Sequence, residues 1–83
     1  MILVEGKVNG KKYTEPFSKG VLSRSLTRAE VGPNKAYSMA AVIESQLKEN
    51  NVSIITVEDL VEYIVKELRK EDPRIAEKYI NWR

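Results

Sequence analysis

The spacing of hydrophobic positions changes several times along the chain, and each change predicts a new element of secondary structure. The apolar run that starts at Ile2, together with the residues up to position 8, predicts a first strand. Asn9-Gly10 follows, a dipeptide typical of a two-residue turn in which both residues adopt positive φ. The return strand is predicted within residues 11–17 and ends at Pro16. The chain is therefore expected to open with a β-hairpin.

Four later segments place apolar residues three or four positions apart, as the buried stripe of an amphipathic helix requires. The predicted helices begin at Ser18, near Pro33, at Thr56 and at Asp72, where N-cap residues or a proline favour a helix start. The β-branched segment 52–55 is too short for a helix and predicts a third, brief strand. The clearest stripe belongs to the third helix, at Val57, Leu60, Val61, Ile64, Val65 and Leu68.

The resulting element order is strand, strand, helix, helix, strand, helix, helix. This order predicts an α+β fold, a four-helix bundle capped by a small three-stranded β-sheet, because that arrangement would bury every apolar stripe. The 83 residues are enough for one compact domain and too few for two, so residues 1–83 are expected to form a single domain.

Composition excludes several classes of function. The chain has no cysteine and no histidine, so it can hold neither a disulfide, a thiolate zinc site nor a nucleophile–histidine centre. No catalytic centre is recognisable in these residues. No apolar run approaches the roughly 20 residues that a membrane-spanning helix needs, and the short apolar start does not resemble a signal peptide. We therefore expect a cytoplasmic protein without a membrane partner.

The charges are unevenly distributed. Residues 1–37 carry seven basic and three acidic side chains, whereas the remaining residues carry an acidic excess. A basic N-terminal half suits an anionic ligand, and ordinary surface scatter is the alternative interpretation. Nucleic-acid binding through Arg24, Arg28 and Lys35 is disfavoured because the net charge of the whole chain is only +2.

The start of the first predicted helix is a candidate anion site. It reads Ser18-Lys19-Gly20 and has no carboxylate in its first turn, so its free N–H groups and positive dipole end suit a phosphate. Lys7 and Lys12 of the hairpin could reach toward this helix if the hairpin folds over it. The alternative is that Lys19 is solvated, Gly20 forms a loose first turn, and the hairpin lysines only solubilise an edge strand.

Four sequence segments resemble the ATP-cone family over essentially the whole chain. They are Lys7-Val8-Asn9-Gly10, Glu15-Pro16-Phe17-Ser18, Ile55-Thr56-Val57-Glu58-Asp59-Leu60, and Ala76 with Tyr79 and Trp82-Arg83. The resemblance implies a regulatory domain that binds ATP, accompanied by Mg²⁺. It also implies that Lys7 lies near the phosphates, that Glu15 and Ser18 lie near the adenine or ribose, and that Arg83 supplies another phosphate contact.

Two further segments, 16–26 and 79–83, resemble the N-terminal region of archaeal 2-phosphoglycerate kinases. In that group such a segment precedes a P-loop kinase domain, which implies a C-terminal kinase domain as partner. The sequence departs from the family pattern at Val8 and Val21, where ATP-cones commonly carry basic residues. These departures keep an alternative open, in which the domain docks on a kinase domain or forms a homodimer without binding nucleotide.

Overall fold

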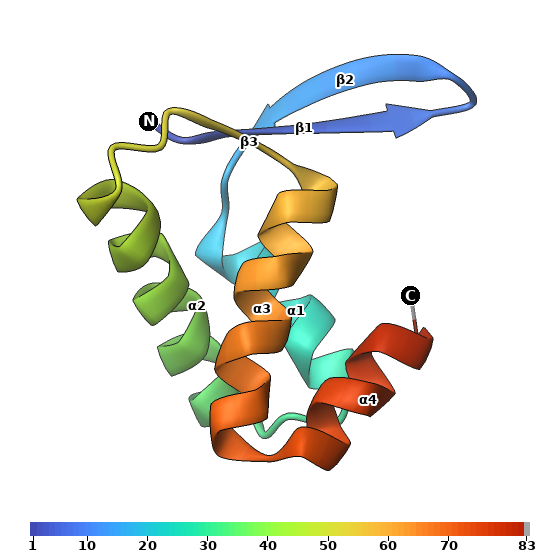
Figure 1. Cartoon of the computed structure of the whole chain (residues 1–83), viewed down its shortest axis with the longest axis vertical. Coiled ribbons are helices and arrows are strands. Elements are labelled where there is room, and N and C mark those ends of the chain that lie inside the picture. The colour runs from blue at the N-terminus through green and yellow to red at the C-terminus, as the bar shows by residue number, and fades with distance from the viewer. Residues whose placement is uncertain (83) are drawn as a thin grey trace.

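The computed structural model describes residues 1–82 and begins with the expected hairpin (Figure 1). Strand β1 (Leu3–Val8) pairs antiparallel with β2 (Lys11–Pro16), and Val8 lies opposite Lys11 across the two-residue turn. Asn9 and Gly10 have φ angles of 52° and 79°. Both values are positive, as a turn matched to the twist of two antiparallel strands requires, so the hairpin prediction is confirmed.

The third strand completes a mixed sheet with the order β2-β1-β3. Strand β3 (Ile54–Thr56) runs parallel to β1, with Val4 beside Ile55. The sequence placed this strand at residues 52–55, two positions too early at its start. Pairing with β1 decides the boundary, and the local β-branched run does not reveal which of its residues find a partner strand.

The helices occupy the predicted segments and are α1 (Lys19–Arg28), α2 (Pro33–Glu49), α3 (Val57–Glu71) and α4 (Pro73–Trp82). Two of them start at a hydroxyl cap, because the Ser18 and Thr56 side chains accept hydrogen bonds from the backbone N–H of Val21 and Asp59, each at 3.2 Å. Such caps satisfy N–H groups that have no partner inside the helix.

The predicted four-helix bundle capped by a sheet is wrong, although the α+β class and the element order are as expected. Helices α1 and α2 pack together as one pair and α3 and α4 as another, while α2 and α3 touch only slightly. A single residue, Asp72, connects α3 to α4. Antiparallel helix neighbours need a loop of about two to five residues, so α4 leaves α3 at a corner and does not join a bundle (Figure 1).

The sheet also shares the core with the helices. Strand β1 contacts α3, and β3 continues directly into it. Buried apolar side chains from the sheet, such as Val4 and Ile55, belong to the same cluster as those of the helices. The largest fully buried side chains are Leu26, Ile43, Leu47, Ile64 and Leu68. The helices lie on one side of the sheet, and the tip of the hairpin projects beyond them (Figure 1).

Candidate functional site

A cleft of about 320 Å³ lies between the end of β2, the first half of α1, the start of α3 and α4. Its size is at the lower end of the range for small-molecule sites, roughly 300–1,000 Å³. Apolar side chains form most of its wall. They are Val4, Pro16, Phe17, Val21, Leu22, Val57, Leu60, Val61, Ile64 and the ring of Tyr79. Among the described lining residues, Glu15 is the one charged side chain.

The polar groups of the cleft come from β2 and α1. Glu15 lies opposite Val4 in the hairpin, so both side chains are on the face of the sheet that is turned toward the helices. The Ser18 hydroxyl caps α1, and the Ser25 hydroxyl donates to the Leu22 carbonyl oxygen at 3.1 Å. The Ser25 O–H is thus already used, whereas Ser18 only accepts at its cap, so the Glu15 carboxylate and the Ser18 O–H are the groups that remain open to a ligand.

The first turn of α1 has no acidic residue, as the sequence indicated. Lys19 extends from this turn toward α2: its Nζ lies 3.6 Å from Oε1 of Glu44 and 5.6 Å from the centre of the Tyr37 ring. Gly20 is exposed, and a Cβ added there would meet only the Ser18 hydroxyl at 3.7 Å. Lys19 is therefore held by an ion pair, and no neighbouring atom requires a glycine at position 20.

Lys7 and Lys12 lie directly opposite each other in the hairpin. Strand side chains alternate between faces, so these lysines are on the face that carries Glu5, away from the face of Val4 and Glu15. They line a separate cavity of about 350 Å³ together with Glu58 at the start of α3. The structure thus places the hairpin lysines near one another but not in the lining of the cleft.

The predicted site residues are therefore distributed over three places. Glu15 and Ser18 line the cleft, Lys19 and Gly20 belong to the adjoining first turn of α1, and the hairpin lysines occupy the other face of the sheet. Arg83 lies outside the described residues.

The apolar floor of the cleft was not predicted as part of a site. Val57, Leu60 and Val61 were assigned to the buried stripe of the third helix, but each is only half-buried. Tyr79, on α4, is buried at the end of the same cleft. Periodicity marks the inward face of a helix, but it does not distinguish a packed core from the wall of a cleft.

Within the described residues, no three or more acidic side chains are grouped so that they could hold a metal ion together. None of the described helices combines the length and apolar character that crossing a membrane requires.

The fold and the cleft define a small α+β domain with a mainly apolar cleft beside the hairpin, and sequence comparison assigns its family. The pattern of the ATP cone domain matches residues 8–83, so the chain belongs to the ATP-cone family. The chain is also 65% identical over 83 residues to the N-terminal region of 2-phosphoglycerate kinase from Methanothermobacter thermautotrophicus, which covers all of this chain and 27% of the relative.

Other archaeal relatives of the same name are more distant. The chain is 39% identical over 77 residues to 2-phosphoglycerate kinase of Methanopyrus kandleri, which covers 93% of this chain and 24% of the relative. It is 32% identical over 75 residues to that of Pyrococcus horikoshii, which covers 89% of this chain and 25% of the relative. The chain thus spans about a quarter of the length of these relatives. No solved structure matches it.

Proposed function

We propose that this domain binds an adenine nucleotide, ATP in the first place, in the cleft beneath the hairpin and acts as a regulatory module. The observation that carries the proposal is the position of Glu15 and Ser18 on the rim of an otherwise apolar cleft at the start of α1. An apolar wall suits a planar base, and a carboxylate accepts hydrogen bonds from its amino group or from ribose hydroxyls. Membership of the ATP-cone family supports the same ligand.

In this proposal the phosphates leave the cleft at the first turn of α1, beside Lys19 and Gly20, and the long side chains of Lys7 and Lys12 reach them from the other face of the sheet. Lys7, Lys12, Lys19, Gly20 and Arg83 are the assigned phosphate contacts. Lys7 and Lys12 carry no ion pair among the described residues, so their ammonium groups can turn toward an anion. Mg²⁺ would enter bound to the phosphates, which supply the oxygen ligands that it prefers.

Isothermal titration calorimetry with ATP, ADP and AMP, with and without Mg²⁺ at low ionic strength, tests the proposal. We expect saturable binding of ATP that weakens as phosphates are removed. The double variant Lys7→Glu/Lys19→Glu should lose binding and keep its melting transition. Arg24→Glu/Arg69→Glu is the control matched in charge, because both arginines are exposed and do not line the cleft. The absence of heat, together with an unchanged melting temperature at millimolar ATP, would overturn the proposal.

The matching region of the relatives also suggests what the domain regulates. We propose that it operates in the cytoplasm as the N-terminal part of a 2-phosphoglycerate kinase and reports nucleotide binding to a C-terminal kinase domain. ATP can change the activity of such an enzyme as a substrate and also as a regulator. Removing the matching region from the Methanothermobacter relative should abolish the regulatory effect of ATP and keep its effect as a substrate. Unchanged regulation in the truncated enzyme would contradict this assignment.

A second candidate function, a module that docks on a kinase domain or forms a homodimer without nucleotide, is favoured by one observation. Val8 and Val21 are 59% and 56% exposed, so the hairpin and the rim of the cleft present apolar side chains to solvent. Light scattering of the isolated chain and titration with a separately expressed kinase domain distinguish this function. Association that ATP does not influence would favour docking, whereas a monomer that binds ATP would favour the nucleotide proposal.

A further inference from the structure

The two free edges of the sheet differ in how they are protected. The order β2-β1-β3 leaves one edge on β2 and the other on β3. The β2 edge carries Lys12 and ends at Pro16, and lysines and prolines are the residues that block further strand pairing. The β3 edge consists of Ile-Ile-Thr, and Ile54 is 50% exposed. The β3 edge therefore has neither the lysines nor the proline that block further strand pairing at the β2 edge.

The backbone groups at this edge point in a direction that a further strand could use. The Leu3 N–H donates to the Ser53 carbonyl oxygen at 2.9 Å, and Leu3 lies beside Ile54 in the parallel register. In a parallel ladder every second residue of a strand forms its backbone hydrogen bonds with the same neighbouring strand. Residues 53 and 55 therefore form their backbone hydrogen bonds with β1. The N–H and C=O groups of Ile54 and the N–H of Thr56 are consequently directed away from the sheet.

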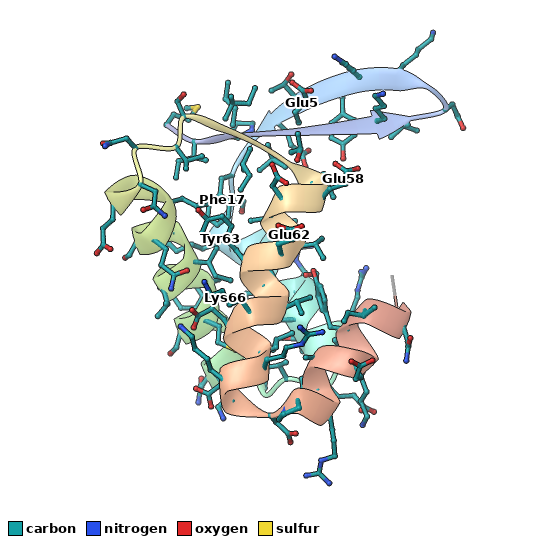
Figure 2. All side chains as sticks on the ribbon, viewed as in Figure 1. Glu5, Phe17, Glu58, Glu62, Tyr63 and Lys66 are labelled. Atoms are coloured by element: carbon teal, nitrogen blue, oxygen red, sulfur yellow. The ribbon has the colours of Figure 1, made fainter. Side chains whose placement is uncertain are left out.

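A groove of about 540 Å³ follows the β3 edge and continues along α3. Figure 2 shows Glu62, Tyr63 and Lys66 on this part of α3, below Glu5 of the sheet. The Tyr63 hydroxyl accepts a hydrogen bond from the Asn50 amide at 3.2 Å, which ties the end of α2 to the wall of the groove. The groove shares no lining residue with the nucleotide cleft, so it is a separate surface.

The charges of the groove favour a basic occupant. Glu5, Asp59 and Glu62 contribute three carboxylates, and Lys66 is the single basic side chain of its described lining. None of these four residues forms an ion pair within residues 1–82. The carboxylates are thus available to a cationic partner, and their attraction would be strongest at low ionic strength.

We propose that the β3 edge accepts an extended, basic segment of another polypeptide as a fourth strand. Main-chain hydrogen bonds to Ile54 and Thr56 would hold the segment in register. Side chains on its inner face would meet Asp59 and Glu62 and would therefore be basic. Side chains on its outer face would lie beside Ile54 and would be apolar. The matching sequence pattern is an alternation of basic and apolar residues.

The test uses a fluorescently labelled seven-residue peptide of alternating valine and lysine with blocked ends, titrated with the whole chain and followed by fluorescence anisotropy. We expect saturable binding that becomes at least tenfold weaker in Ile54→Lys and in Glu62→Lys. Glu77→Lys makes the same charge change on an exposed residue of α4 and should leave binding unchanged. Equal weakening in Glu77→Lys and Glu62→Lys would overturn the proposal, since binding would then depend on net charge alone.

Two further measurements separate strand pairing from attraction between charges. The same peptide with N-methyl groups on its central amides keeps its lysines but cannot donate, and it should lose binding. Backbone amide shifts in a heteronuclear NMR titration should centre on residues 54–56 and the first half of α3. Retained binding of the methylated peptide, or shifts centred on the hairpin, would overturn the proposal. So would self-association through β3 that the peptide cannot displace, because a second copy would then occupy this edge.

Discussion

The ring of Tyr13 lies over Gly6, its direct neighbour across the hairpin. A Cβ added at Gly6 would lie 2.6 Å from Cε1 of Tyr13, closer than any normal contact. Glycine weakens the interior of a strand, and an aromatic ring packed across it restores the lost contact. Because Gly6 is buried beneath this ring while the hairpin tip projects beyond the helices, the pair stabilises the part of the sheet that no helix covers.

The first prediction concerns this pair. Gly6→Ala should displace the Tyr13 ring and lower the free energy of unfolding by about 1–3 kcal/mol, the usual cost of overpacking. In a Tyr13→Ala background the same change should be neutral or stabilising, because alanine then loses less backbone entropy than glycine. Urea denaturation of the two single variants and the double variant measures the coupling. Additive effects would mean that the ring contact contributes nothing to stability.

A cation introduced at the rim of the cleft should strengthen ATP binding if the proposed function is right. Val21 lines the cleft and is 56% exposed, so Val21→Lys can be accommodated without disturbing the core. A charge-assisted contact contributes about 1.5–3 kcal/mol, which corresponds to roughly a tenfold or greater gain in affinity. Val42 is also exposed but lies on α2, away from the cleft lining, so calorimetry should show that Val42→Lys leaves the affinity for ATP unchanged. Equal gains in both variants would indicate a nonspecific effect of charge.

The N-cap of α1 should contribute to stability and to the shape of the cleft. Ser18→Ala removes the acceptor of the Val21 N–H and should cost about 1 kcal/mol, whereas Ser18→Gly should cost a few tenths. Thr56→Ala makes the equivalent change at the start of α3. Thermal melts compare the three variants. Both alanine variants should lose a similar amount of stability, but only Ser18→Ala should weaken nucleotide binding. A Ser18→Ala variant as stable as the parent chain would show that water replaces the cap.

The pH dependence of stability should include a contribution from Glu67. A hydrogen bond from the Gln46 amide, at 2.8 Å, lowers the pKa of Glu67 below its ordinary value of 4.5. The Lys70 ammonium, at 3.1 Å, lowers this pKa further, whereas partial burial of the carboxylate raises it. The folded state therefore favours the charged carboxylate. This stabilisation is present above the unfolded-state pKa and is lost as the pH falls through the lower folded-state value.

Glu67→Gln tests this contribution, because glutamine cannot titrate. Denaturation midpoints measured between pH 7 and pH 3 should show the parent chain losing its advantage over the variant as the pH falls. Glu77→Gln, at an exposed position of α4, should keep the parent profile. Parallel curves for Glu67→Gln and the parent chain would contradict the assignment.

Burial separates core positions from cleft positions that share one helical stripe. Leu26 is fully buried on α1, and Leu26→Ala should lower the free energy of unfolding by about 2–5 kcal/mol. Val21→Ala, on the exposed rim, should change it by less than about 0.5 kcal/mol. Chemical denaturation checks both. Comparable losses at the two positions would mean that the cleft wall is packed like the core.

The sequence of this protein determined its local structure because the necessary signals lie close together along the chain. Asn9-Gly10 specified the hairpin turn, Ser18 and Thr56 specified helix starts, and periodic apolar residues marked the inward face of each helix. Glu15 and Ser18 line the cleft. Their place near an adenine or ribose, which the family resemblance implied, stays a prediction.

Tertiary structure alone decided how these elements meet. The one-residue connection at Asp72 sends α4 away from α3, so the four helices form two pairs instead of a bundle. Strand register places Lys7 and Lys12 on the face away from Glu15, and Glu44 of α2 engages Lys19. These relationships join residues that are distant in sequence, and side-chain periodicity specifies only which way a residue faces on its own element. Which neighbour it meets there depends on packing between elements, and for this chain that packing leaves Lys19 beside the cleft but puts Lys7 and Lys12 on the other face of the sheet.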